Sequence, residues 1–337
     1  MILFSNILTD LIITNVENYN MKIVALDAYT VNHGDLSWEP FSDVAEFITY
    51  DRTERSKVVE RAIDADAILT NKVIIDAEIM AQLPQLKYIG VLATGYNVVD
   101  VEEASRRGIV VTNIPAYSTN SVAQKVFALI LNITDSVDHY SRANREGRWS
   151  SCPDFCYWDE PLHEIAGKTL GIVGLGNIGM RVAKIALAFG MKVVSSTSKD
   201  AESLPEGIEK VTLDTLLEKS DIISLHCPLT ALNKGFINKD ALSRMKPNAI
   251  LVNTGRGPLV VEQDVADALN NGVISAYAAD VMESEPPSSS SPLLNLPNVY
   301  LTPHIAWATV EARVRLMDIA LSNVKAFIDG KPINVVG

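Results

Sequence analysis

The stretch TLGIVGLGNIG, residues 169–179, decides the fold of this chain. Its first five residues are mostly apolar and predict a buried strand. Three glycines follow in the spacing GxGxxG, and a helical pattern over residues 181–189 comes directly after them. A strand, a glycine-rich turn and a helix in this order are typical of a dinucleotide-binding βαβ unit.

Each glycine of this turn has a separate physical task. Gly174 permits the tight turn, Gly176 lets the backbone approach a pyrophosphate, and Gly179 lets the helix pack closely on the strand. The N-terminus of the helix then offers free N–H groups and the positive end of its dipole to phosphates. Glycines that merely join a strand to a helix are the alternative, and the sequence context disfavours it.

The next predicted strand, residues 192–195, leads to the position that distinguishes NAD from NADP. An acidic side chain there binds the ribose 2′-hydroxyl, whereas a nearby cation without that acid permits a 2′-phosphate. The strand register puts Thr197 at this position, with Ser198 and Lys199 beside it and Asp200 further along. The pattern leans toward NADP, and the choice between NAD and NADP stays open.

Short β-rich runs alternate with amphipathic helical runs over most of the 337 residues. This alternation predicts an α/β fold with parallel, doubly wound sheets, and the length is that of about two domains. Strands are expected at residues 22–26, 67–70, 88–91 and 110–112, and then at 168–173, 192–195, 221–225, 249–252, 276–279 and 299–301. The second series, with six strands, has the size of a complete dinucleotide-binding sheet.

Charge and cysteine usage limit the partners. The net charge of −12 comes from 29 Lys and Arg against 41 Asp and Glu. An acidic surface repels nucleic acid and anionic membranes, so neither is an expected partner. Three cysteines without CxxC spacing, and histidines without an HxH or HExxH pair, disfavour disulfides and metal sites. We therefore expect a metal-free cytoplasmic protein.

Residues 1–20 precede the first predicted strand. Their apolar stretch, residues 7–14, is interrupted by Asp10 and has neither a preceding Lys or Arg nor a cleavage site of small residues. It does not resemble a signal peptide and is too short to span a membrane. We expect a lead-in outside the core, either an upstream translation start or a disordered segment.

Three polar residues follow predicted strands in the second half of the chain. Arg256 lies in VNTGRG (252–257), Glu285 in DVMESEPP (280–287) and His304 in LTPHIAW (301–307). Parallel sheets bind ligands at the carboxyl ends of their strands. Oxidation of a 2-hydroxy acid needs a base, the reverse reaction needs an acid, and histidine serves as both. A carboxylate behind the ring would fix its tautomer, and a guanidinium could bind a carboxylate or polarise a keto oxygen.

With this set the chain resembles the D-isomer-specific 2-hydroxyacid dehydrogenase family, whose members use a catalytic Arg, Glu and His. Family-like stretches run from Met21 to the C-terminus and include GVLATGYN (90–97), NIPAYS (113–118), LHCPLT (225–230) and NTGRG (253–257). WSSCPDFCYW (149–158) most resembles the glycerate dehydrogenase (hydroxypyruvate reductase) branch. The resemblance implies hydride transfer between NAD(P)H and a small 2-keto acid, most closely hydroxypyruvate, giving D-glycerate.

The resemblance also assigns residues to roles. Backbone N–H groups of Thr94 and Gly95, with Arg256, would hold the substrate carboxylate. Asp280 would bind the nicotinamide amide, and Asn233 replaces the family's usual Thr. The implied cofactor contacts are Gly174, Gly176, Asn177, Ile178, Gly179, Thr197, Ser198, Lys199, Cys227, Pro228, Asn233, Thr254, Asp280 and Ala306.

Domain boundaries follow from the same resemblance. A Rossmann-type cofactor domain, residues 118–303, would be inserted into a flavodoxin-like substrate domain of residues 21–117 and 304–337. Trp149, Tyr157 and Trp158 in the aromatic stretch 149–158 would serve as the arm of a homodimer, with a plain packing role as the alternative for each. Other acids (glyoxylate, lactate, phosphoglycerate) stay open as substrates. A dinucleotide-sensing binding protein of the corepressor type is a further alternative, disfavoured because the chain lacks the long disordered tails of such proteins.

Overall fold

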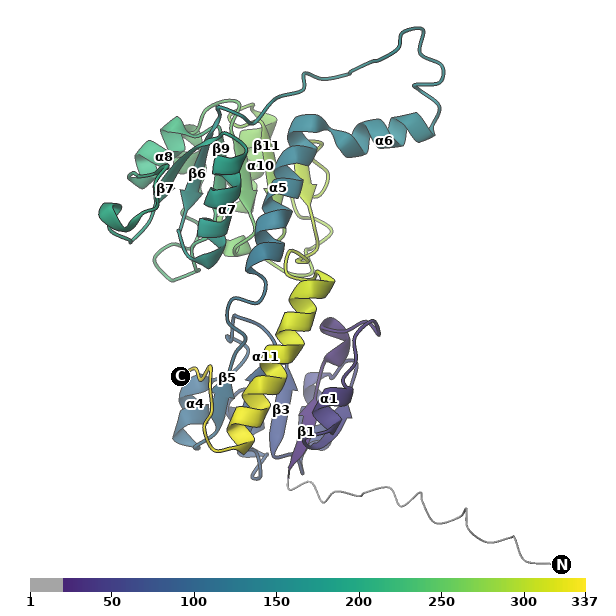
Figure 1. Cartoon of the computed structure of the whole chain (residues 1–337), viewed down its shortest axis with the longest axis vertical. Helices are drawn as coiled ribbons and strands as arrows, with labels where there is room; N and C mark the ends of the chain where they lie inside the picture. Colours follow the sequence, from purple (N-terminus) through teal and green to yellow (C-terminus); the bar gives the residue numbers. More distant parts are fainter. Residues whose placement is uncertain (1–20) are drawn as a thin grey trace, which may run out of the picture. The chain divides into compact units, whose positions relative to one another are not determined.

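The computed structural model describes residues 21–337, so the expectations for residues 1–20 lie outside it. The chain divides into two compact units (Figure 1). The first comprises the described residues up to Tyr117 together with Val314–Gly337, and the second comprises Ser118–Arg313. Residues 304–313, which we expected in the first domain, therefore cluster with the second unit.

The first unit is a five-stranded parallel sheet with the order β2-β1-β3-β4-β5. This is the flavodoxin-like order that we expected. β3 and β4 are buried along their whole length, as central parallel strands are. The strands are β1 Lys22–Ala25, β2 Glu46–Thr49, β3 Ala67–Thr70, β4 Tyr88–Val91 and β5 Val110–Thr112, and the helices are α1 Glu39–Ser42, α2 Val58–Ala62, α3 Ala77–Ala81, α4 Val101–Arg106 and α11 Val310–Ile328, which begins in the second unit.

The second unit is a seven-stranded parallel sheet with the order β12-β11-β10-β9-β6-β7-β8. The prediction of six strands was wrong, because β8 is a three-residue edge strand with two exposed residues and shows no apolar run. The strands are β6 Thr169–Val173, β7 Lys192–Ser196, β8 Ile208–Lys210, β9 Ile222–Leu225, β10 Ile250–Asn253, β11 Ala276–Ala279 and β12 Val299–Leu301, and the helices are α5 Thr119–Asp135, α6 Val137–Arg145, α7 Asn177–Ala188, α8 Leu213–Lys219, α9 Lys239–Ser243 and α10 Glu262–Asn270.

The strand order of the second unit locates its binding edge. From β6 the chain proceeds outward through β7 and β8, and it then returns to β9 on the other side of β6. In doubly wound sheets ligands bind beyond the carboxyl ends of the strands at this switch point.

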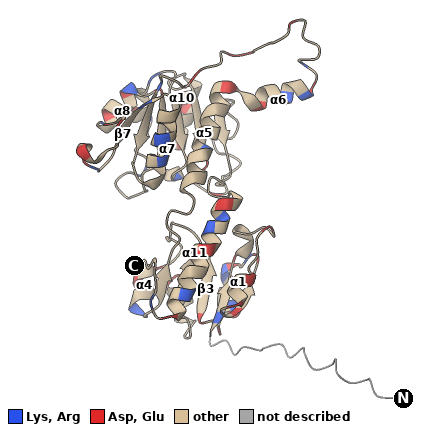
Figure 2. Cartoon of the chain, in the orientation of Figure 1, with Lys and Arg blue, Asp and Glu red and all other residues tan. Residues whose placement is uncertain are grey.

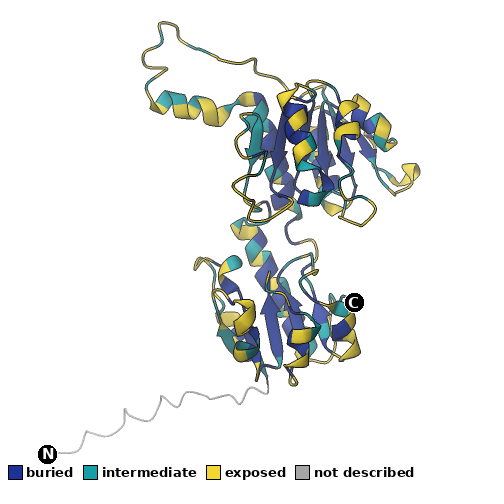
Figure 3. Cartoon of the chain, turned by 180° about the vertical axis from the view of Figure 1, so that it is seen from behind, coloured by how far each residue is buried: buried dark blue, intermediate teal, exposed yellow. Residues whose placement is uncertain are grey.

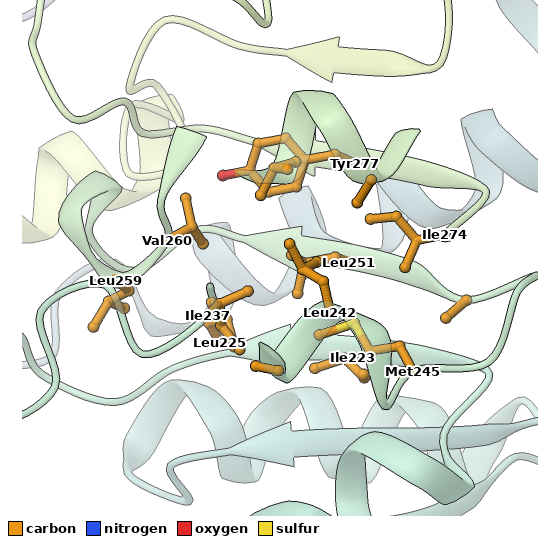
Figure 4. Close-up of a cluster of buried hydrophobic side chains, with 14 of the residues drawn as sticks. Ile223, Leu225, Ile237, Leu242, Met245, Leu251, Leu259, Val260, Ile274 and Tyr277 are labelled. Carbon is orange, nitrogen blue, oxygen red and sulfur yellow. The ribbon is translucent and has the colours of Figure 1, made fainter. Parts of the chain in front are cut away.

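Two layers of apolar side chains hold the sheet of the second unit in place. Figure 4 shows the layer in which Leu251 and Tyr277 from the strands pack with Leu242 and Met245.

α6 and residues 146–164, which follow it, lie outside these cores. α6 has no buried residue, and a left-handed Ser136 separates it from α5. Figure 3 shows this part of the chain largely exposed, and Trp149, Phe155 and Trp158 are 55%, 89% and 68% exposed.

Charged residues of both signs are interspersed over the helices of each unit (Figure 2). Among residues 21–337, no helix combines the length and the apolar character needed to cross a membrane.

Candidate active site

The glycine turn has the geometry that dinucleotide binding requires. Gly174 has a φ of +91°, and a Cβ there would lie 2.6 Å from the backbone nitrogen of Cys227. A Cβ on Gly179 would lie 2.2 Å from the carbonyl oxygen of Gly174. At Gly176, by contrast, a Cβ would meet nothing within 4 Å. The first and third glycines are thus required by close packing, and the second faces open space into which a phosphate fits.

The beginning of α7 is free to bind an anion. Gly176 is its N-cap residue, and no side chain caps the helix. The N–H groups of Asn177 and Ile178 have no hydrogen-bond partner among the described residues. Free N–H groups together with the helix dipole favour a pyrophosphate at this position.

A second cation, Lys210 on β8, contacts the polar loop after β7. Lys199 donates its backbone N–H to Thr197 Oγ1 at 3.3 Å, so these residues and Ser198 form a compact turn. Lys210, on β8, donates its Nζ to the carbonyl oxygen of Lys199 at 2.5 Å. Sequence reasoning missed Lys210, because it did not predict the edge strand that carries it.

The other predicted cofactor residues differ in their availability. Thr254 Oγ1 is buried and has no hydrogen-bond partner within the described chain, which is the state expected of a group that bonds a ligand. Asn233 is instead used locally: its Oδ1 accepts from the N–H of Thr230, and its Nδ2 donates to the carbonyl of Pro228. Burial raises the pKa of the Cys227 thiol, which indicates packing rather than reactivity.

The three predicted catalytic residues follow three adjacent strands. Arg256 comes after β10, Glu285 after β11 and His304 after β12. His304 Nδ1 lies 2.6 Å from Glu285 Oε2. Glu285 Oε1 accepts the N–H of Met282 at 3.0 Å, so the carboxylate is held from its own loop. The arrangement fixes one ring nitrogen of His304 and leaves Nε2 for proton exchange.

The loops of Arg256 and Glu285 are in direct backbone contact. A Cβ on Gly257 would lie 1.9 Å from the carbonyl oxygen of Met282 and 2.5 Å from the nitrogen of Glu283. Only glycine allows this approach. The Arg256 side chain is exposed, and its Nη1 donates to the carbonyl of Gly255 at 2.8 Å.

Asp280 holds the turn that carries His304. It is 1% exposed. Oδ1 accepts from Thr302 Oγ1 at 2.5 Å and from the N–H of Ile305 at 2.9 Å, and Oδ2 accepts from the N–H of Ala306 at 2.7 Å. The predicted bond from Asp280 to a nicotinamide amide remains a prediction. The structure adds a role that sequence alone did not indicate.

In the first unit, the loop of residues 92–95 presents unpaired donors. The carbonyl of Ala93 accepts from the N–H of Ile114 at 3.0 Å, and that of Thr94 accepts from Asn113 Nδ2 at 2.8 Å. The N–H groups of Thr94 and Gly95 have no partner among the described residues. Because a trans peptide directs its N–H opposite to its C=O, the two donors point away from their anchors.

Two further observations concern titratable groups. His226 is next to the glycine turn, and burial lowers its pKa to about 4; its Nε2 lies 2.8 Å from Ser224 Oγ. In the described residues, no group of three His, Cys, Asp or Glu side chains has the arrangement that would hold a metal ion.

Comparison with known proteins identifies the family. Residues 127–306 match the model of the D-isomer specific 2-hydroxyacid dehydrogenase, NAD binding domain. The chain is 47% identical to a hydroxypyruvate reductase of Blautia hydrogenotrophica, over 94% of this chain and 99% of the relative. It is 41% identical to a glycerate dehydrogenase of Methylorubrum extorquens, over 94% and 98%.

Solved structures agree. The chain superimposes on an NADPH-dependent glyoxylate/hydroxypyruvate reductase from Sinorhizobium meliloti, in complex with NADP and malonate, with a TM-score of 0.80, 31% identity and coverage of 94% of this chain and 97% of that one. The predicted family and the predicted fold are thereby confirmed. This chain belongs to the D-isomer specific 2-hydroxyacid dehydrogenase family, and it is an NAD(P)-dependent oxidoreductase of small 2-hydroxy and 2-keto acids.

Proposed function

We propose that this enzyme reduces hydroxypyruvate to D-glycerate, with glyoxylate as a second substrate. The 2.6 Å contact between His304 and Glu285 carries the proposal, because it provides the acid that a keto oxygen needs. The choice of hydroxypyruvate is supported by the two relatives whose names are hydroxypyruvate reductase and glycerate dehydrogenase.

The roles follow from the chemistry of each group. When bound, the reduced nicotinamide supplies the hydride that the keto carbon accepts. His304 donates the proton from Nε2 to the keto oxygen, while Glu285 holds the opposite side of the ring. Arg256 and the N–H groups of Thr94 and Gly95 bind the carboxylate of the substrate. The reverse reaction uses the same groups, with His304 as the base.

We assign cofactor binding to the second unit, with NADPH preferred over NADH. The open space at Gly176, the uncapped start of α7 and the unpartnered Thr254 hydroxyl support binding of the dinucleotide. Lys199 and Lys210 beside the loop after β7 support the preference, because two cations favour a 2′-phosphate.

We further propose a homodimer in the cytoplasm. The exposed aromatic residues Trp149, Phe155 and Trp158 form the arm, and a second copy would cover them. Light scattering after gel filtration tests the dimer, and Trp158→Glu should shift the mass toward that of one chain. The cytoplasm is proposed because the three cysteines are free.

A substrate panel tests the proposed activity. Hydroxypyruvate, glyoxylate, pyruvate and 3-phosphohydroxypyruvate are each offered with NADH and with NADPH, and the absorbance of the reduced cofactor is followed. The highest kcat/KM is expected for hydroxypyruvate with NADPH. A higher kcat/KM for another acid would identify that acid as the preferred substrate in place of hydroxypyruvate. No turnover with any pair would favour a dinucleotide-sensing binding protein.

A further inference from the structure

The 92–95 loop is anchored at its beginning by a buried side chain. Asn71, which follows β3, is 4% exposed, and its Nδ2 donates to the carbonyl of Leu92 at 2.6 Å. Leu92 in turn donates its N–H to the carbonyl of Thr70 at 2.7 Å. The carbonyls of Ala93 and Thr94 accept hydrogen bonds from Ile114 and Asn113, which follow β5. Three successive carbonyls of this loop are therefore held in place. The carbonyls of Ala93 and Thr94 direct the N–H groups of Thr94 and Gly95, and the Leu92 carbonyl fixes the peptide plane immediately before them.

Asn71 is itself fixed by a buried carboxylate. Asp27, just after β1, is 4% exposed and accepts three backbone N–H groups: Oδ1 from Asn71 at 2.8 Å, and Oδ2 from Lys72 at 2.6 Å and Val73 at 3.2 Å. Burial raises the pKa of Asp27, whereas the three N–H groups and the positive charge of Lys72 lower it.

Burying a carboxylate is costly, and a neutral residue could terminate β1 equally well. The three N–H groups that donate to Asp27 all belong to residues 71–73. The Asn71 side chain in turn donates to the 92–95 loop. The network thus runs in one direction, from the end of β1 through the end of β3 to the end of β4. It ends at the Leu92 carbonyl, one peptide before the two donors that we assign to the substrate.

We propose that Asp27 and Asn71 are positioning residues for the substrate carboxylate, acting through the orientation of the 92–95 loop. The inference rests on the proposed function, since it assumes that the N–H groups of Thr94 and Gly95 bind a 2-keto acid. It predicts a defect in binding of the acid alone, because Asp27 and Asn71 contact no residue assigned to the cofactor or to proton transfer.

The test uses the full-length enzyme and three variants. Asn71→Ala removes the bond to Leu92 and keeps the Asp27 contacts, while Asp27→Asn replaces one acceptor by a donor. Asp66→Asn is the matched control, because Asp66 lies in the same sheet at the amino end of β3 and accepts from the backbone of Lys22. The KM values for hydroxypyruvate and NADPH, kcat and the melting temperature are measured for each.

For Asn71→Ala we expect the KM for hydroxypyruvate to rise about tenfold, the effect of one misdirected hydrogen bond to a charged group. The KM for NADPH should stay within about twofold and kcat within about threefold. Asp27→Asn should show the same pattern at greater magnitude, and Asp66→Asn should lower only the melting temperature.

Two outcomes would overturn the inference. One is a folded Asn71→Ala variant with an unchanged KM for hydroxypyruvate, and the other is an equal rise in both KM values. Should Asp27→Asn fail to fold, Asn71→Ala still decides. A wild-type enzyme that turns over no keto acid would instead refute the proposed function, so the two failures are distinguishable.

Discussion

Replacement of Gly257 by alanine tests whether the catalytic loops depend on their backbone contact. The added Cβ would lie 1.9 Å from the carbonyl oxygen of Met282, 2.0 Å from its carbonyl carbon and 2.5 Å from the nitrogen of Glu283. All three atoms belong to the backbone, so no side-chain rotation relieves the clash. The Arg256 loop and the Glu285 loop must therefore move apart.

The required movement can be read from the structure. Ordinary contact between non-bonded atoms begins at about 3.5 Å, so the two loops must separate by about 1.5 Å. A misplacement of about 1 Å in a catalytic set costs about 100-fold in rate, and overpacking costs about 1–3 kcal/mol of stability. We expect Gly257→Ala to lose about 100-fold or more in kcat/KM for hydroxypyruvate and to remain folded.

Gly255→Ala is the matched control two residues away. Its Cβ would meet the carbonyl oxygen of Leu225 at 3.3 Å and Leu259 Cδ1 at 3.4 Å, distances that need only a small adjustment. Its kcat/KM should stay within about threefold of wild type. Binding of NADPH, followed by its fluorescence, should persist in both variants. Gly257→Ala with near-wild-type kcat/KM would show that the contact between the loops does not position the catalytic groups.

Three further predictions concern single side chains. His304→Ala should lower kcat about 10²- to 10⁴-fold while NADPH still binds, and unchanged turnover would exclude its role in proton transfer. Lys210→Ala should raise the KM for NADPH about fivefold or more and leave that for NADH unchanged, because only NADPH carries the 2′-phosphate. The pKa of His226 in the folded chain is about 4, below its ordinary 6.5. Between pH 6.5 and pH 4 the unfolded chain therefore binds a proton at His226 that the folded chain does not bind. The free energy of unfolding, measured with urea, should fall by about 2 kcal/mol more in wild type than in His226→Gln as the pH is lowered from 6.5 to 4; an equal fall in both would contradict this.

Much of the fold could be predicted because its signals are local. The glycine turn of residues 174–179 lies between an apolar strand and a helix, and these neighbours alone specify a dinucleotide-binding βαβ motif. Buried parallel strands such as β3 and β11 are continuous apolar runs, so their limits were predicted correctly. β2 and β8 are edge strands with two exposed residues each and no continuous apolar run, and they were missed for this reason.

The contacts that support the site could not be predicted from the sequence. Gly257 is recognisable as a glycine of a loop, but its need for close approach depends on Met282, which is distant in sequence. The same holds for Asn71 and Leu92, whose bond depends on the register between β3 and β4. A sequence shows which residue types are available at strand ends. It does not show which backbone groups those residues must hold.

His304 illustrates how such support and catalysis are connected. Its φ of +54° is in the left-handed region, which costs a non-glycine residue about 1 kcal/mol or more. Asp280 compensates, because its two oxygens accept from residues on both sides of His304, at Thr302, Ile305 and Ala306. The strained conformation thus persists because a buried carboxylate determines the turn. Asp280 and Asp27 therefore act alike, each at the end of a buried strand and each ordering a loop whose free groups are proposed to contact the substrate.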